Sequence, residues 1–326
     1  MSNYPPFLSF PKVILKIVLF GFFVLVTFHK GICQKRESYP KVNNKIGDAI
    51  ELRHDNDLFY ATDRYYSAGL FIGWRKLSIL ETDSIHRTQY RLFLSQEMYT
   101  PTDIIATDID KFDRPYAGFL GISGGVTETY KKSLFDYKLL VGFSGPLSGA
   151  SFVQNLFHKS ATVDSRIPSW VGQIKTSFYI NLYFNYVQEW KFQANPFSVY
   201  MAISPKAAFG NRDNYLQNDM VFYFGKRNSM MHSAVYQQIG DFEKELFFAI
   251  RLGYRYVINN AMLGGNALGD SSIYLLEPYQ HLFLYNFEIH RRGKRNIYKF
   301  SCNFSTPETF NLQPQLYTTF TFLRSF

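Results

Sequence analysis

The sequence predicts an all-β fold, a twelve-stranded antiparallel transmembrane β-barrel with a short helix in an extracellular loop. Apolar and polar residues alternate in many segments, and the chain ends in the aromatic run YTTFTFLRSF. No segment beyond the N-terminus reaches the roughly 18 continuous apolar residues of a membrane helix. Alternation with period two indicates strands, and barrel closure pairs every backbone polar group inside a bilayer. A soluble β-sandwich is the alternative, but it would have to bury an aromatic outer face.

The N-terminus explains part of the apolar content. Lys12 and Lys16 precede the uncharged run IVLFGFFVLVTF at residues 17–28, which is shorter than the roughly 20 residues of a membrane-spanning helix. A basic start, a short apolar core and the break at HKGICQ predict a signal peptide over residues 1–33, with cleavage after Cys33. A lipoprotein site at Cys33 is the alternative.

The barrel domain then covers residues 34–326. Loss of three lysines and no acidic residue lowers the formal net charge from +9 to +6, because 32 basic residues remain against 26 acidic ones. This modest positive charge suits an anionic membrane surface and is too dispersed to indicate nucleic-acid binding. Only Cys302 remains, so no intrachain disulfide can form.

The alternation places the twelve strands in order along the chain. In residues 245–257, for example, every even position from Leu246 to Tyr256 is apolar. The expected strands lie near residues 48–54, 66–76, 88–98, 117–129, 134–144, 176–190, 196–209, 219–226, 245–257, 277–290, 297–304 and 315–324.

The longest connections are expected on the extracellular side, because periplasmic turns of such barrels are short. They lie around residues 99–116, 145–175, 210–218 and 259–275. The second contains GPLSGASFVQNLFHKSATVDS, where Ser148 could cap a short helix over residues 150–160.

Two groups of residues could carry chemistry. Gln154 and His158 are four residues apart and would share one face of the predicted helix. His158 would be a base, and Gln154 would be the group that orients it. A solvated loop helix is the alternative. The sequence has no Gly-x-Ser-x-Gly motif, no P-loop and no Cys/His zinc spacing, which excludes the usual sites of those kinds.

The second group is the oxygen-rich stretch HDND before a strand. An EF-hand is excluded, because Tyr60 stands where its loop requires glycine. Asn56 and Asp57 could aim at one ion, although acidic residues at a barrel rim are more often simply solvated. Asp55 and Asp63 are interpreted as such rim or turn residues.

Four blocks in this order resemble a known family: NDLFYATDRYYSAGL, FDRPYAGFL, VGFSGPLSGASFVQNLFH and SWVGQI. The chain resembles the outer-membrane lipid A 3'-O-deacylase (LpxR-type) family across residues 50–190 by motif and across the remainder by barrel pattern. The resemblance implies a twelve-stranded barrel whose active site lies between the wall and a helix of an extracellular loop. It also implies calcium-dependent removal of the 3'-linked acyloxyacyl group of lipid A.

The residues that match the family's site are Asn56, Asp57, Ser67, Gln154 and His158. Ser67 is a departure, because the family pattern includes threonine there, but the hydroxyl is retained. The resemblance implies that His158 is the general base that takes a proton from water, because histidine titrates near neutrality. Ca²⁺ held by Asp57 and Asn56 would stabilise the oxyanion. Gln154 and Ser67 would position the base, the water or the oxyanion, and an acyl-enzyme at Ser67 is the lesser option.

The expected protein is a monomer in the outer membrane of a Gram-negative bacterium, with its active site facing the outer leaflet. Its partners would be lipid A or lipopolysaccharide and the outer-membrane lipids, and no nucleic acid. Two alternatives remain open from sequence. One is a non-catalytic barrel, such as a pore or scaffold, and the other is a barrel esterase that acts on another lipid.

Overall fold

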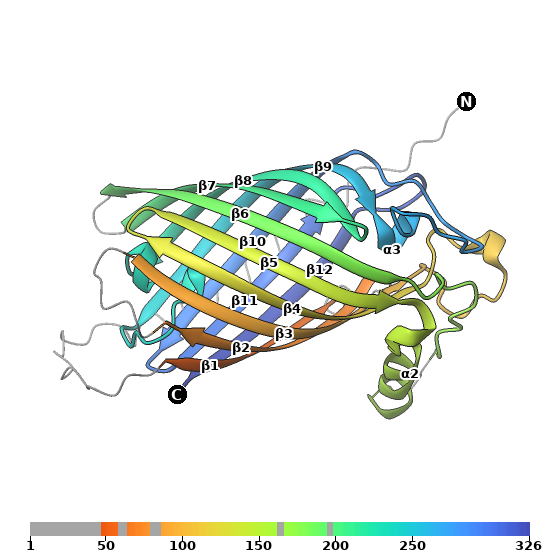
Figure 1. The fold of residues 1–326 in the computed structure, drawn as a ribbon, viewed down its shortest axis with the longest axis horizontal. Helices are drawn as coiled ribbons and strands as arrows, with labels where there is room; N and C mark the ends of the chain where they lie inside the picture. The colour runs from red at the N-terminus through yellow and green to blue at the C-terminus, as the bar shows by residue number, and fades with distance from the viewer. Residues whose placement is uncertain (1–46, 58–63, 79–85, 162–165, 194–197) are drawn as a thin grey trace, which may run out of the picture. The chain divides into compact units, whose positions relative to one another are not determined.

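Twelve antiparallel strands close into a barrel in the part of the chain that the structure describes, which confirms the predicted fold (Figure 1). The structure is a computed structural model and describes residues 47–57, 64–78, 86–161, 166–193 and 198–326. The barrel unit spans Lys45–Phe326. The predicted signal peptide, residues 1–33, lies outside the described residues and remains a prediction.

Each strand pairs with its neighbours in sequence, and β1 also pairs with β12 to close the barrel. The strands are β1 (Asp48–Asn56), β2 (Tyr65–Leu77), β3 (His86–Thr100), β4 (Ala117–Tyr130), β5 (Ser133–Ser144), β6 (Phe178–Gln193), β7 (Ser198–Gly210), β8 (Asp213–Lys226), β9 (Glu245–Asn260), β10 (His281–Gly293), β11 (Asn296–Ser305) and β12 (Gln315–Ser325).

The apolar side of the strands faces outward. In β1, Ile50 and Leu52 are exposed while Ala49 and Glu51 are buried. In β9, three of the even positions that the sequence singled out, Ile250, Leu252 and Tyr254, are likewise exposed. Apolar residues outside and polar residues inside are the arrangement of a barrel surrounded by lipid. Among the described residues, no helix is long and apolar enough to span a membrane.

The connections that carry η3, α2 and α3 lie at one end of the barrel (Figure 1). Three of the four expected ones are found there. They contain the 3-10 helix η3 (Ile109–Lys111), the 3-10 helix η4 (Gly145–Ser148) with the helix α2 (Ala150–Ala161), and the short helix α3 (Ala261–Gly264). The helix predicted over residues 150–160 is thus confirmed as α2.

The prediction of a long connection at residues 210–218 is wrong. β7 ends at Gly210 and β8 begins at Asp213, so only a short turn separates them. The polar start of β8 resembles a loop in sequence, but its side chains bind inside the lumen. Gln217 is buried, accepts a hydrogen bond from Arg255 at 2.7 Å and donates one to Asp219 at 2.6 Å.

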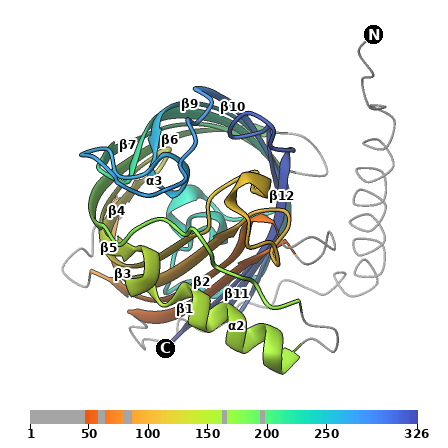
Figure 2. The ribbon, with the colours of Figure 1, turned by 90° about the vertical axis from the view of Figure 1, so that its right-hand side faces the viewer.

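The connection between β8 and β9, residues 227–244, is long although it lies at the opposite end, where short turns were expected. It carries two 3-10 helices, η5 (Met230–His232) and η6 (Ala234–Tyr236), which lie inside the ring of strands (Figure 2). Met230 and Ile239 are buried in a core cluster with side chains of the barrel wall. Protein therefore fills the lumen at this end.

Charged side chains anchor this inward connection to the wall. Arg227 donates two hydrogen bonds to Glu189 of β6, at 2.7 and 3.0 Å, and both side chains are buried. Arg292 of β10 donates to the carbonyl oxygen of Gln238 at 2.5 Å. A buried, bidentate Arg–carboxylate pair is specific in geometry, so the connection is fixed in one position.

Candidate active site on the outer wall of the barrel

Asn56 and Asp57, at the end of β1, are held against the backbone of β2. Asn56 Nδ2 donates to the carbonyl oxygen of Ser67 at 3.2 Å, and the Asp57 amide donates to the same oxygen at 3.3 Å. Thr318 of β12 donates its hydroxyl to the Asn56 carbonyl oxygen at 3.0 Å. The buried Asp57 carboxylate accepts from the amide of Arg64 at 2.8 Å. These bonds tie the end of β1 to both neighbouring strands.

The alternation of β1 decides on which side of the wall Asn56 lies. Asn56 has the same parity as the outward residues Ile50 and Leu52, and it pairs with Ala68 of β2. Successive strand residues point to opposite faces, so Asn56 is directed to the outer side of the barrel. A polar side chain at this position faces lipid unless something covers it.

Ser67 lies at an irregularity of β2. Tyr66 pairs with Tyr99 and Ala68 pairs with Met98, so the register shifts and Ser67 has no opposite residue on β3. A bulge of this kind redirects a side chain and is common beside active sites. Tyr66 reaches Asp55 of the lumen side, while Ser67 contacts the helix outside, as described next.

Gln154 of α2 covers Ser67. It is 5% exposed, and its Nε2 donates to the Ser67 hydroxyl at 3.4 Å. Its Oε1 accepts from the indole N–H of Trp170 at 2.9 Å. Because the indole can only donate, this bond fixes which end of the amide faces Ser67. Trp170 is held in turn by Tyr116, whose ring centroid is 5.1 Å away.

A glycine allows α2 to start against the wall. A Cβ on Gly118 of β4 would lie 2.4 Å from Ala150 Cβ and from Ser148 Oγ, which is too close for any side chain. The chain turns into the helix through Gly149, whose φ is +69°. Ser148 accepts a hydrogen bond from the Ala150 amide at 3.3 Å, as its predicted capping role requires.

Two residues beside the site have a left-handed backbone. Tyr65 has φ +65° and Trp170 has φ +53°, a region that bulky residues rarely adopt. Tyr65 begins β2 two residues before Ser67, and Trp170 donates to Gln154. Strain of this kind persists where the surrounding structure enforces it, and it is concentrated at functional sites.

His158 lies on α2 four residues after Gln154 and is half-buried. Side chains at this spacing lie one above the other on a helix. The structure thus brings Asn56, Asp57, Ser67 and Gln154 together by hydrogen bonds, with His158 one helical turn further along α2.

The interpretation of Asp55 as a solvated rim residue is wrong. Asp55 is 1% exposed because its parity directs it into the lumen, where it accepts from Arg53 at 3.1 and 2.7 Å and from the Tyr66 hydroxyl at 2.8 Å. Tyr66 packs against Tyr99 and Tyr317, each at 5.1 Å. This network supports the wall behind the site. Asp63 lies outside the described residues.

Arg114, from the block FDRPYAGFL, is another buried residue that the sequence analysis did not select. It is fully buried, donates to the Met262 carbonyl oxygen at 3.1 Å and lies 3.7 Å from Glu308. Burial lowers the pKa of its guanidinium, and the Glu308 carboxylate opposes that shift. It therefore joins the α3 connection to the one that follows β11.

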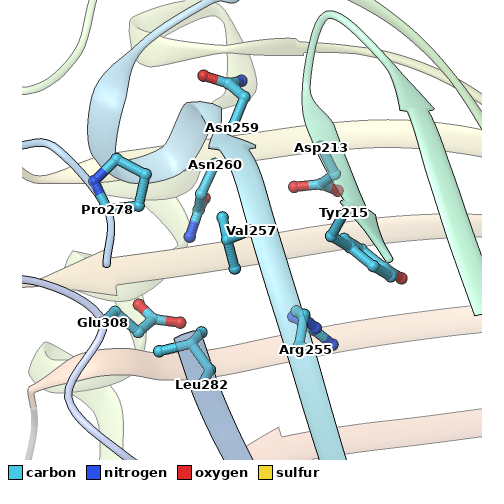
Figure 3. A pocket seen from close by; sticks show the side chains of 9 residues that line it. All are labelled: Asp213, Tyr215, Arg255, Val257, Asn259, Asn260, Pro278, Leu282 and Glu308. Carbon is cyan, nitrogen blue, oxygen red and sulfur yellow. The ribbon is translucent and has the colours of Figure 1, made fainter. Parts of the chain in front are cut away.

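A small polar cavity lies beside Glu308 (Figure 3). Its volume of about 30 Å³ matches one or two water molecules and is far too small for a lipid. It is lined by Asp213, Tyr215, Arg255, Val257, Asn259, Asn260, Pro278, Leu282 and Glu308.

Comparison with known proteins identifies the family. The family model described as outer membrane protein LpxR matches residues 19–326. The chain belongs to this family. The solved structure of LpxR from Salmonella typhimurium is similar with a TM-score of 0.70 and 16% identity, over 85% of this chain and 100% of that chain. The β domain of the Bordetella autotransporter Brka has a TM-score of 0.47 and 10% identity, over 86% of this chain and 99% of that one. No curated protein matches.

Membership of the LpxR family places the protein in the outer membrane. The likeness to LpxR from Salmonella typhimurium agrees with the barrel fold. Trp170 and Arg114 lie in two of the blocks that carry the resemblance, yet the sequence alone assigned them no role. A signal was present for Trp170, because it is one of only three tryptophans and lies in a connection.

The donors at the site fit Ca²⁺ in kind. Asn56 and Asp57 offer an amide oxygen and a carboxylate, which are the hard ligands that Ca²⁺ prefers. Within the described ranges, no three His, Cys, Asp or Glu residues gather into a metal-binding group. Since Ca²⁺ takes about six to eight oxygen ligands, backbone carbonyl groups or water would have to complete the shell.

Proposed function

We propose that this chain hydrolyses the 3'-O-linked acyloxyacyl ester of lipid A, at the site between the wall of β1–β2 and the helix α2. Family membership supports an outer-membrane lipid A deacylase in general terms. The observation that carries the proposal is the hydrogen-bonded group of Asn56, Asp57, Ser67 and Gln154, in which Asn56 is directed to the outer side of the wall and Gln154 covers Ser67 from α2. An ester within a membrane lipid can reach that side without entering the lumen.

The proposed chemistry uses water as the nucleophile. His158 takes a proton from water, the hydroxyl oxygen attacks the ester carbonyl carbon, and the proton is returned to the leaving alkoxide. Gln154 is held by Trp170 with its NH₂ group toward Ser67, so it is an oriented donor next to the place where the oxyanion would form. Ser67, 2% exposed and bonded to Gln154, is better suited to positioning than to nucleophilic attack.

The metal is part of the proposal. Asp57 and Asn56 would hold a Ca²⁺ ion, which when bound supplies Lewis-acid stabilisation of negative charge on oxygen. The orientation is proposed as well. Because three of the long connections, including the one with α2, share one end of the barrel (Figure 1), that end would face the outer leaflet. We propose that the protein acts as a monomer.

Two alternatives are a pore and an esterase for another lipid. The filled lumen distinguishes the proposal from the first, and the identity of the substrate distinguishes it from the second. A pore is disfavoured, because residues 227–244 occupy one end of the lumen. An esterase for another lipid would use the same residues, so only product analysis separates the two.

The test is mass spectrometry of lipid A from Gram-negative cells that express the chain. Loss of one 3'-acyloxyacyl unit is expected with the wild type and with His281→Ala, a control histidine in β10. His158→Ala should leave lipid A intact. Intact lipid A with correctly inserted wild type would refute the substrate, and activity in His158→Ala would refute the base.

A further inference from the structure

The outward side of α2 is apolar although it touches no part of the barrel. Phe152 is 71% exposed and Leu156 is 54% exposed. Phe152 and Leu156 are four apart and therefore adjacent on the helix surface. On the opposite side, Gln154 and Ala150 are buried against the wall. The helix thus has one side for the barrel and one apolar side without a protein partner in the described chain.

This apolar side continues the outer belt of the barrel. Phe143, near the end of β5, and Phe178, at the start of β6, are exposed on the outer wall. Leu147 in η4 is 60% exposed and lies between Phe143 and Phe152 in the chain. Seen along the barrel axis, α2 runs along the rim and away from the ring of strands, so it does not lie across the lumen (Figure 2).

We propose that the outward side of α2, formed by Phe152 and Leu156 and extended by Leu147 of η4, is embedded in the hydrocarbon of the outer leaflet. The occupant is the acyl-chain layer that already surrounds the belt. A helix with aromatic and leucine residues on one side suits the membrane interface. Lys159 is exposed at the end of the same helix, where its long side chain can reach lipid phosphates.

The membrane contact would hold the helix over the site. Between α2 and the outer wall, the hydrogen bond from Gln154 to Ser67 is 3.4 Å long. A hydrogen bond of this length is weak. Seating α2 in the leaflet would press Gln154 and His158 toward the wall. It would also let a lipid ester enter sideways, directly from the leaflet. This second consequence rests on the proposed function, whereas the seating does not.

The experiment uses nitroxide labels on the full chain refolded in phosphatidylcholine vesicles. Cysteines are introduced by Phe152→Cys or Leu156→Cys in a background with Cys33→Ser and Cys302→Ser. The control is Phe310→Cys, because Phe310 is also 71% exposed but stands alone in the connection after β11. Ile72→Cys, on the outer wall of β2, is the reference for hydrocarbon.

The nitroxide labels at residues 152 and 156 should be as accessible to dissolved oxygen as the label at residue 72. The label at residue 310 should instead be accessible to a water-soluble nickel chelate. Equal nickel access at 152, 156 and 310 would overturn the proposal. Spin–spin broadening between copies at 152 would also overturn it, because the occupant would then be a second chain. Heat-modified electrophoretic mobility verifies that each variant is folded.

A second measurement tests lipid entry. The double variant Phe152→Ser, Leu156→Ser should hydrolyse lipid A in vesicles about tenfold more slowly, since two apolar side chains lose their burial. It should match the wild type on lipid A dispersed in detergent. Phe310→Ser should match the wild type in both. Equal rates in vesicles would refute sideways entry. A wild type inert in both forms would refute the proposed function and leave the label result to decide the seating.

Discussion

Trp170→Phe tests whether the orientation of Gln154 matters for the reaction. The substitution keeps an aromatic ring beside Tyr116 but removes the N–H that donates to Gln154 Oε1 at 2.9 Å. A buried acceptor left without its donor costs about 1–3 kcal/mol. The remaining bond to Ser67, at 3.4 Å, is too weak to hold the amide. The amide can then turn its oxygen toward Ser67, where it repels an oxyanion.

The expected result is a fall in kcat of roughly 10- to 100-fold, because about 1.4 kcal/mol corresponds to a factor of ten. KM should change little, since Trp170 lies behind Gln154. The assay is the initial rate of acyl release from lipid A by purified, refolded protein with Ca²⁺. Trp190→Phe is the matched control, because Trp190 is exposed on the outer wall of β6. An unchanged kcat in folded Trp170→Phe would refute the role given to the indole.

Three further predictions concern the metal, the hydroxyl and the lumen. Chelation of divalent cations should abolish hydrolysis, and Asp57→Asn should require more Ca²⁺ for half-maximal rate; a rate indifferent to chelator would refute the calcium site. Ser67→Thr should stay active while Ser67→Ala loses about fivefold, measured as kcat, because one hydrogen bond is worth about 1 kcal/mol; equal rates would remove the hydroxyl from the mechanism. Arg227→Ala leaves the buried Glu189 carboxylate without its cationic partner, which costs about 3–5 kcal/mol. The unfolding temperature should drop relative to the exposed control Arg295→Ala, and no drop would contradict the anchoring role.

The strands could be predicted from sequence because alternation is a local property. Each of the twelve expected strands has its counterpart, and the outward position of Ile250 and its neighbours follows from period two alone. The start of β8 could not be predicted. Asp213 and Gln217 read as a loop, because the residues that bind them, such as Tyr183 and Arg255, come from other strands.

The inward connection at residues 227–244 escaped prediction for the same reason. It has no periodic pattern of its own, and its position depends on Glu189 and Arg292, which are far away in the chain. At the candidate site, the residue types could be selected by motif. The geometry of the site could not be predicted from the sequence. The irregularity at Ser67 and the hydrogen bond that Trp170 donates to Gln154 exist only once β2, β3 and α2 are assembled.

The position of the site follows from parity and from one extra residue. Along β1, Asp55 enters the lumen and Asn56 faces outward, so the two neighbours that look alike in sequence belong to different sides of the wall. On β2, the register shift allows Tyr66 to reach Asp55 inside while Ser67 contacts Gln154 outside. Without the shift, the parity of the exposed Leu70 and Ile72 would have sent Tyr66 outward and Ser67 inward. Asn56 and Ser67 therefore lie on the outer wall, with α2 above them. A lumen that is filled at one end is compatible with a substrate that never enters the lumen.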